Sequence, residues 1–364
     1  MENSKPLSSW NPLEGPLNIF GPCSAEGPEH MMLTAKGLVN TGIPFIFRAG
    51  LWKPRTRPGS FEGYGAKALP WLTEVKKELG VKITTEVATP EHVELCLKAG
   101  VDVLWIGART TANPFSVQAL ADALKGLDIP VLVKNPIHAD LGLWIGALER
   151  IAGSGITLLG AIHRGFHHYD NRPYRNCPDW ELPIELKRQY PHLPIICDVS
   201  HISGHPDIIP MVAQRAMDLN MDGLLIESHI DPKVALSDAK QQVTPEELEL
   251  IYNGLRRGQE RIQDADFLEE LEALRKQIDE IDVAMLDLLA ERMNIVQGIG
   301  EQKREKGVTI FQLQRWRDVM ENFLSRGGQK GLSKGFVKKI LEAIHLESIE
   351  IQERSVRYQV TSKP

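Results

Sequence analysis

Two short apolar runs of this chain each end in side chains that can bind a metal ion. PIICDVSH ends on His201, and GLLIE ends on Glu227. Asp238 follows eleven positions later, in the expected loop. Parallel β/α folds present their chemistry at the carboxyl ends of buried strands. The pattern therefore predicts a site that contains His201, Glu227 and Asp238, and His205 and His229 are weaker candidates because they fall beyond the strand ends.

A cysteine at another strand end extends this set. The motif GPCSA places Cys23 directly after an apolar run near the start of the chain. A thiolate, an imidazole and two carboxylates form a mixed S, N and O ligand set. Such a set suits Mn, Fe, Co or Zn, and the spacing alone does not choose among them.

The elements that must position these residues recur along most of the chain. Eight nearly unbroken apolar runs, rich in β-branched residues, alternate with helix-length spacers between residue 17 and about residue 254. Such runs suit parallel strands that are buried on both faces. Eight units in this length predict a (β/α)8 barrel, and an open doubly wound sheet is the alternative.

The ends of the runs also carry many cations. The residues at these ends are Arg48, Lys53, Arg55, Glu86, Arg109, Lys134 and Arg164. A barrel gathers all of these ends at one mouth. Clustered Lys and Arg side chains repel one another unless anions join them, so the set predicts substrates with two anionic groups, such as phosphates or a phosphate and a carboxylate.

Composition limits the class of protein. The chain has 364 residues and a net charge of −6, which argues against nucleic acid as a partner. The sequence has no apolar run of membrane-spanning length and begins without a signal-peptide pattern, so we expect no membrane association. Four cysteines without CxxC spacing do not indicate a disulfide framework, and we expect the protein in the cytoplasm.

Several motifs of the first part resemble the metal-dependent 3-deoxy-arabino-heptulosonate 7-phosphate (DAHP) synthases. These motifs are GPCSAEG, FRAGLWKPRT, IGART, LVKNP, HRG, DVSHISG and IES…ALSD. Members of that family condense phosphoenolpyruvate with erythrose 4-phosphate, in the first step of the shikimate pathway. The resemblance implies that the metal ligands are Cys23, His201, Glu227 and Asp238, with Mn²⁺ as the first choice of metal and Fe²⁺, Co²⁺ or Zn²⁺ as alternatives. It implies that phosphoenolpyruvate is bound by Arg48, Lys53, Arg109, Lys134 and Arg164. It also implies that the aldose phosphate is bound by Arg55 and Thr56.

The implied chemistry assigns two further roles. Lys53 is the expected proton donor to the aldehyde, and Glu86 is expected to orient the attacking water. Two residues depart from the family pattern: Asn135 follows Lys134, and His163 precedes Arg164 where a Glu is usual. We expect these departures to affect water and phosphate handling. The related 3-deoxy-octulosonate phosphate synthases, which use arabinose 5-phosphate, are the nearest rival, and the motif KPRT favours the four-carbon sugar.

The alternation stops near Gly254, and a different pattern follows. Apolar residues recur at three- and four-residue spacing from Phe267 to about Lys306, which predicts one long helix. Two shorter helices are expected over 310–326 and 333–356. At about 100° per residue, Arg292 and Lys303 lie near the centre of the apolar stripe of the long helix. Buried cations are costly unless they are paired, so these residues indicate a helical bundle whose interior binds a dicarboxylate.

This second part resembles the all-helical chorismate mutases over about residues 266–356. By motif, the binding positions are Arg275, Arg292, Lys303, Arg315, Ser348 and Gln352. In that family chorismate rearranges to prephenate without a cofactor; Lys303 and Gln352 would stabilise the ether oxygen while the arginines hold the carboxylates. Arg275 lies at the edge of the stripe and is expected to reach a partner's site, which implies a homodimer. Trp316 and Gln312 stand where bacterial members have acids, so we expect altered affinity for the substrate hydroxyl.

Together the patterns predict a bifunctional enzyme with a barrel over residues 1–255, a linker over 256–265 and an all-helical dimerising domain over 266–364. Its expected partners are phosphoenolpyruvate, erythrose 4-phosphate, chorismate and a second copy of the chain. A product such as prephenate, bound in the helical domain, is expected to damp the barrel reaction. Two alternatives remain for the helical part, namely a non-catalytic dimerisation and sensor module, or a plain coiled-coil arm.

Overall fold

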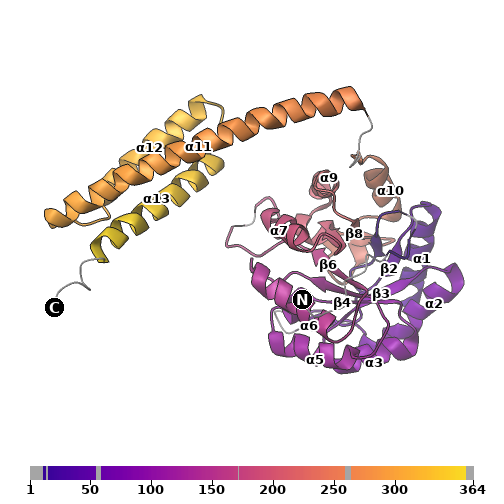
Figure 1. Cartoon of the computed structure of the whole chain (residues 1–364). Helices are drawn as coiled ribbons and strands as arrows, with labels where there is room; N and C mark the ends of the chain where they lie inside the picture. Colours follow the sequence, from indigo (N-terminus) through magenta and orange to yellow (C-terminus); the bar gives the residue numbers. More distant parts are fainter. Residues whose placement is uncertain (1–10, 14, 55–58, 171, 259–263, 358–364) are drawn as a thin grey trace. The chain divides into compact units, whose positions relative to one another are not determined.

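A computed structural model of the chain describes residues 11–13, 15–54, 59–170, 172–258 and 264–357, with side chains described up to residue 354. The chain divides into two compact units, residues 1–260 and 261–364. Each unit has its own set of elements, coloured in sequence order in Figure 1.

The first unit is a closed barrel of eight parallel strands in sequential order. The strands are β1 (Ile19–Gly21), β2 (Ile46–Arg48), β3 (Ile83–Val87), β4 (Val103–Ile106), β5 (Val131–Lys134), β6 (Leu159–His163), β7 (Ile195–Asp198) and β8 (Gly223–Glu227). Closure is made by β1 and β8, where Phe20 is in register with Ile226 and Gly21 with Glu227. The predicted barrel is therefore confirmed, and the open sheet is excluded.

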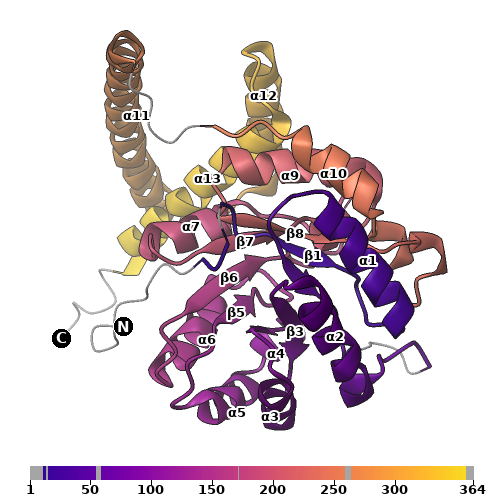
Figure 2. The same ribbon diagram turned by 90° about the vertical axis from the view of Figure 1, so that its right-hand side faces the viewer.

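Helices surround the strands, as Figure 2 shows for α1, α2, α3, α5, α6 and α7. The helices of this unit are α1 (Pro28–Asn40), α2 (Leu69–Leu79), α3 (Pro90–Ala99), α4 (Ala108–Thr111), α5 (Pro114–Leu124), α6 (Leu141–Gly153), α7 (Glu181–Gln189), α8 (Val199–Ser203), α9 (Ile209–Asp218) and α10 (Pro245–Asn253). Local signals fix several starts: Asn113 and Asp140 cap α5 and α6, and Thr244 forms a capping box with Glu247 at α10.

The strands separate two apolar layers. Side chains such as Ile46, Leu132, Ile162, Ile196 and Leu225 fill the barrel interior, whereas alternate residues pack against the helices. Because side chains alternate between the faces of a strand, the position two residues after an interior residue also faces inward. Those positions hold Arg48, Lys134, Arg164, Asp198 and Glu227, so the same period that fills the core delivers charged groups to the mouth.

The second unit contains the helices α11 (Ala265–Glu305), α12 (Leu313–Gln329) and α13 (Lys334–Arg357). These agree with the expected long helix and the two shorter ones. Figure 1 shows α12 and α13 packed along the C-terminal part of α11, while its first part extends beyond them. Accordingly, the buried residues of α11 are Val296 and Gly300, near its C-terminal end.

The N-terminal part of α11 exposes many apolar side chains. More than half of the surface of Leu274, Ile278, Ile281 and Leu288 is exposed in the single chain. Such a stripe is typical of a helix face that another helix covers. Within the described residues, the structure contains no helix that combines the length and the apolar character needed to cross a bilayer.

Candidate active sites

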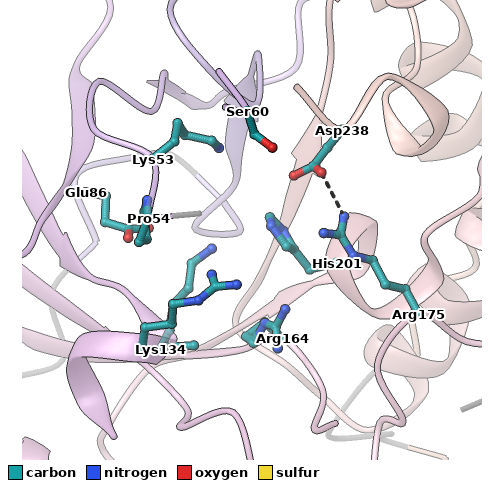
Figure 3. Close-up of a pocket in the computed structure, with 11 residues that line it drawn as sticks. Lys53, Pro54, Ser60, Glu86, Lys134, Arg164, Arg175, His201 and Asp238 are labelled. Atoms are coloured by element: carbon teal, nitrogen blue, oxygen red, sulfur yellow. Dashed lines mark ion pairs between the residues drawn. The ribbon is translucent and has the colours of Figure 1, made fainter. Parts of the chain in front are cut away.

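A cavity of about 400 Å³ opens at the carboxyl ends of the barrel strands. Among the described residues, five cations line it: Lys53, Arg109, Lys134, Arg164 and Arg175. Figure 3 shows Lys53, Lys134, Arg164 and Arg175 around one common space with Glu86, His201 and Asp238. This concentration of positive side chains in an acidic protein makes the cavity suited to anionic molecules.

Three of the four expected metal ligands converge beside this cavity. Cys23, Glu227 and Asp238 each offer a donor atom within 4.8 Å of the others. The thiol of Cys23 donates to Asp238 Oδ2 at 3.2 Å. The fourth expected ligand, His201, is not part of this group, but it lies next to it, with its Nδ1 3.9 Å from Glu227 Oε1. The four residues come from the ends of β1, β7 and β8 and from the loop after β8.

Asp198 orients the imidazole of His201. It is fully buried at the end of β7, and its carboxylate lies 2.9 Å from Nδ1 of His201 and 2.9 Å from Nζ of Lys134. With Nδ1 engaged, Nε2 remains as the nitrogen that can bind an ion. The weaker candidate His229 instead faces Glu26, at 3.8 Å.

Lys53 bridges the cation set and the ligand set. Its Nζ donates to the carbonyl oxygen and to Sγ of Cys23, both at 2.9 Å. Burial and the charge of Glu227 raise the pKa of Cys23 to about 12, although Lys53 opposes this rise. Burial lowers the pKa of Lys53, but the charges of Cys23 and Glu227 outweigh it and leave that pKa above its usual value. Around neutral pH the Cys23 thiol is therefore protonated and Lys53 is cationic.

Arg48 lies deeper than the other cations. Only 1% of its surface is exposed, its Nη1 is 3.2 Å from Glu227 Oε1, and its Nη2 donates to the Cys23 carbonyl at 2.9 Å. Its guanidinium also sits 5.0 Å from the centre of the Trp105 ring. In the described structure Arg48 is therefore placed to hold Glu227 and the β1 end, beneath the lined cavity.

Arg109, Lys134 and Arg164 face the cavity as the sequence predicted. Burial lowers the pKa of Arg164 to about 10, and the neighbouring cations Arg175 and Arg109 act in the same direction. Repulsion from these neighbouring cations makes the binding of an anion next to the Arg164 guanidinium favourable. Arg55 and Thr56, the expected aldose phosphate ligands, lie outside the described residues.

Glu86 is held at the cavity wall by two neighbours. Trp105 Nε1 donates to Glu86 Oε2 at 2.9 Å. Gly107 leaves room for the carboxylate, because a Cβ at that position would lie 2.6 Å from Glu86 Cδ. The motif IGART thus needs its glycine for close approach.

The loop between β6 and α7 brings a cation that sequence reasoning missed. Arg175 lies 3.3 Å from Asp238 Oδ1 and also donates to Gln241, whose own amide bonds the Glu227 carboxylate. Its charge helps to hold the pKa of Asp238 well below the usual range, against the effect of burial. Nothing in its spacing signalled this position, because an irregular loop has no side-chain period.

The two departures from the family pattern have structural explanations. Asn135 donates to the carbonyl oxygen of Gly165 at 2.9 Å and accepts from the backbone of Arg164 at 2.7 Å, so it fixes the turn after β6. His163 is fully buried and points away from the mouth, against Trp144 and Trp180. His163 therefore does not line the mouth itself, because residue parity on β6 turns it toward the helices.

In the helical unit, the inward residues form a second cluster. Arg292 Nη1 donates to Ser348 Oγ at 2.7 Å, and Gln352 donates to the Ser348 carbonyl at 2.9 Å. Ser348 and Gln352 are buried, at 5% and 8% exposure. Lys303 donates to the carbonyl of Ile310 at 2.6 Å. Burial lowers the pKa of Arg292, as expected for a cation between packed helices.

Two predicted members stand apart from this cluster. Arg275 is exposed and pairs with Glu272 at 3.7 Å, and its α-carbon lies about 26 Å along α11 from that of Arg292 at about 1.5 Å per residue. Arg315 is exposed on α12. Trp316 stacks on His345, with ring centres 3.8 Å apart. At position 316, where the resemblance implies an acid, the chain thus has a tryptophan that stacks on a histidine.

The fold and the first site define a class: a parallel β/α barrel whose mouth joins a set of thiol and carboxylate groups that could hold a metal ion to a cationic pocket. Residues 14–264 match the model of the "DAHP synthetase I family", and the chain belongs to that family. Residues 274–353 match "Chorismate mutase type II". The predicted fusion of the two is confirmed.

Individual relatives agree with this assignment. The chain is 33% identical over 225 residues to the phospho-2-dehydro-3-deoxyheptonate aldolase of Thermotoga maritima, which covers 62% of this chain and 64% of that protein. It is 29% identical to the 2-dehydro-3-deoxyphosphooctonate aldolase of Helicobacter pylori, over 64% of this chain and 92% of that protein. A crystal structure of the Thermotoga maritima DAHP synthase superposes with a TM-score of 0.59 at 31% identity, over 65% of this chain and 67% of that one.

Proposed function

We propose that the barrel condenses phosphoenolpyruvate with erythrose 4-phosphate to give DAHP and inorganic phosphate. The observation that carries this proposal is the convergence of five cations on one cavity that also borders a thiol, an imidazole and two carboxylates. Two phosphorylated substrates need this number of cations, and an aldehyde carbonyl needs an electrophilic partner.

The residues divide the work by position. Arg109, Lys134 and Arg164 hold phosphoenolpyruvate, so that its C3 faces the aldehyde carbon. Holding two reactants in one geometry contributes up to about 7–11 kcal/mol in well-oriented cases. As C3 bonds to the aldehyde carbon, Lys53 protonates the resulting alkoxide. Glu86 orients the water that adds at C2, and the phosphate leaves from C2.

The donor set at the mouth fits a divalent ion of borderline softness. Cys23, His201, Glu227 and Asp238 would hold the ion, which would polarise the aldehyde carbonyl as a Lewis acid. Mn²⁺ is our first choice, with Fe²⁺, Co²⁺ or Zn²⁺ as alternatives. DAHP formation should stop in excess chelator and return when Mn²⁺ is added. Full activity in the stripped enzyme would contradict the assignment.

The sugar is the second question for the barrel. The relatives include octulosonate-type aldolases that are similar over most of their length, so arabinose 5-phosphate is the competing substrate. We assign erythrose 4-phosphate because the deoxyheptonate aldolase has the higher identity and because of the motif KPRT. A kcat/KM comparison of the two sugars decides the matter, since a preference for arabinose 5-phosphate would reverse our assignment.

We further propose that the helical unit converts chorismate to prephenate. Arg292, Ser348 and Gln352 present cationic and polar groups between α11 and α13, and Lys303 contacts the carbonyl of Ile310 after α11. Charge builds on the ether oxygen in the transition state, and Lys303 and Gln352 would stabilise it. Arg292 and Arg315 would hold the two carboxylates.

Lys303→Ala tests this assignment, with Lys306→Ala as the matched control. Lys306 lies one helical turn later at the exposed end of α11. Chorismate turnover should fall by at least about 100-fold in Lys303→Ala, since one lost donor to a developing oxyanion costs about 10²–10³ in kcat. Lys306→Ala should retain it. Equal turnover in both variants would leave the helical unit as a dimerisation or sensor module.

We infer that two chains assemble through α11. The apolar side chains from Leu274 to Leu288 are largely exposed among the described residues, and Arg275 lies about 26 Å along α11 from Arg292 of the same chain. The site then takes Arg275 from the partner. Mixing inactive Arg275→Ala and Lys303→Ala chains should restore turnover, because half of the sites in mixed dimers hold both residues. If mixtures stay inactive after subunit exchange, Arg275 does not act across the dimer.

The fusion of the two units leads to a proposal about how the barrel reaction is regulated. We propose that prephenate, bound in the helical unit, lowers the rate of the barrel reaction, which requires different affinities for two states of the enzyme. Barrel kinetics with and without saturating prephenate test this proposal, and unchanged kinetics would reject it.

A further inference from the structure

A second group of potential metal donors lies in the connection between β6 and α7. His168, Cys177 and Asp179 offer an imidazole, a thiol and a carboxylate, with donor atoms that all lie within 4.8 Å of one another. The imidazole Nε2 of His168 is 2.6 Å from Asp179 Oδ2. The residues around the barrel cavity are different ones, so this cluster is separate from the catalytic site.

The backbone holds these donors close together. Phe166 and Cys177 form an antiparallel bridge, with N–H to O distances of 2.7 and 2.8 Å in the two directions. The bridge closes the neck of the loop, so His168 and Asp179 lie on either side of it. The carbonyl of Asp179 also accepts from Leu182 at the start of α7, at 2.9 Å. A donor set that the fold already gathers needs little ordering when an ion arrives.

Ions can reach the cluster from solvent. The His168 side chain is 42% exposed and the Asp179 side chain is 16% exposed.

We propose that His168, Cys177 and Asp179 bind a second divalent cation of borderline softness, for which Zn²⁺ and Co²⁺ are the probes. Sulfur, nitrogen and oxygen donors in one set are typical of such ions, and a tetrahedral ion would take solvent at its fourth position. The alternative is a plain hydrogen-bonded group with no affinity for metals, and the experiment below separates the two.

The position of the cluster gives such an ion a structural role. Cys177 directly follows Asn176, whose amide donates to the His201 carbonyl at 2.6 Å and accepts from Arg164 at 3.0 Å. Arg175, next in line, reaches Asp238. An ion at Cys177 would therefore fix the backbone that presents Arg175 to the barrel mouth.

Cobalt stoichiometry in the full-length, chelator-stripped protein tests the proposal. A thiolate ligand gives Co²⁺ a near-ultraviolet charge-transfer band, which reports Cys–metal bonds directly. The wild type should bind two ions per chain. Cys23→Ser should keep the thiolate band through Cys177, and Cys177→Ser should keep it through Cys23. The double variant should lose it. Asp170→Asn, an exposed acid on the same loop, is the control and should bind two ions.

The contrary results are equally distinct. One ion per chain in the wild type together with loss of the thiolate band in Cys23→Ser, or two ions in Cys177→Ser, would overturn the proposal. If Cys177→Ser does not fold, His168→Asn replaces it as the test. This variant removes a half-exposed ligand and should likewise bind one ion fewer per chain than the wild type. In a Cys23→Ser background, Zn²⁺ should raise the unfolding temperature, and adding Cys177→Ser should abolish that rise. These readouts do not depend on which reaction the barrel catalyses.

Discussion

The buried imidazole of His163 makes barrel stability depend on pH, and His163→Leu should remove part of that dependence. His163 is fully buried between Trp144, Phe166 and Trp180. Burial lowers its pKa to about 3, whereas an unfolded histidine has a pKa of about 6.5. The native state therefore keeps this side chain neutral at pH values where the unfolded state binds a proton.

The sign and size follow from proton linkage. Between pH 6.5 and 3 the unfolded state holds one more proton at this position than the native state, so the free energy of unfolding decreases as the pH falls. The loss is about 1.4 kcal/mol per pH unit well below pH 6.5. Between pH 7 and pH 5 it amounts to about 2 kcal/mol for a native pKa of about 3.

Urea unfolding at pH 7 and pH 5, followed by tryptophan fluorescence in chelator at fixed ionic strength, measures this effect. The wild type should lose about 2 kcal/mol more between the two pH values than His163→Leu. His192→Leu, at an exposed histidine, should behave as the wild type does. The comparison uses differences between two pH values, so a general change in stability by the leucine cancels. Equal losses in wild type and His163→Leu would refute the reasoning.

Three further substitutions probe the barrel mouth. Asp198→Asn keeps the shape of the side chain but removes the charge beside His201, so Mn²⁺ affinity measured by EPR should fall about 10- to 100-fold. Unchanged affinity would show that this contact does not orient the imidazole. Gly107→Ala should turn Glu86 away and lower kcat for DAHP formation about 100-fold with little change in unfolding temperature; a wild-type kcat would remove Glu86 from the mechanism. Arg175→Ala should raise KM for a phosphorylated substrate at least about 10-fold, with partial recovery in Arg175→Lys, since hydrogen bonds to charged groups contribute about 1.5–3 kcal/mol. Unchanged KM values would limit Arg175 to a structural role.

The barrel mouth could be predicted because strand geometry carries the information. Lys134, Arg164 and Glu227 each stand two residues after an interior apolar residue, and that period is visible in sequence. The same period places His163 outward.

Other features of the sites have no periodic signal. Arg175 comes from an irregular connection, and its ion pair with Asp238 joins loops that are far apart in sequence. Asp198 reads as an ordinary strand residue until Lys134 and His201 are seen on either side of it. Trp316 was noted as a departure, but its stacking partner His345 lies on another helix and only tertiary structure pairs them.

The arrangement of charges at the mouth suggests why a metal set and an anion pocket occur together. Three cations are matched by carboxylates of the site: Arg48 by Glu227, Lys134 by Asp198 and Arg175 by Asp238. Two of these carboxylates, Glu227 and Asp238, are proposed metal ligands. When Glu227 and Asp238 ligate an ion, their negative charge compensates Arg48 and Arg175 less. The positive potential of Arg48 and Arg175 then acts on an incoming anion. Since coupling between two binding events is reciprocal, bound phosphoenolpyruvate should also strengthen retention of the ion. These ion pairs thus compensate the charge of the buried cations, and bound substrate and metal would replace the ion pairs.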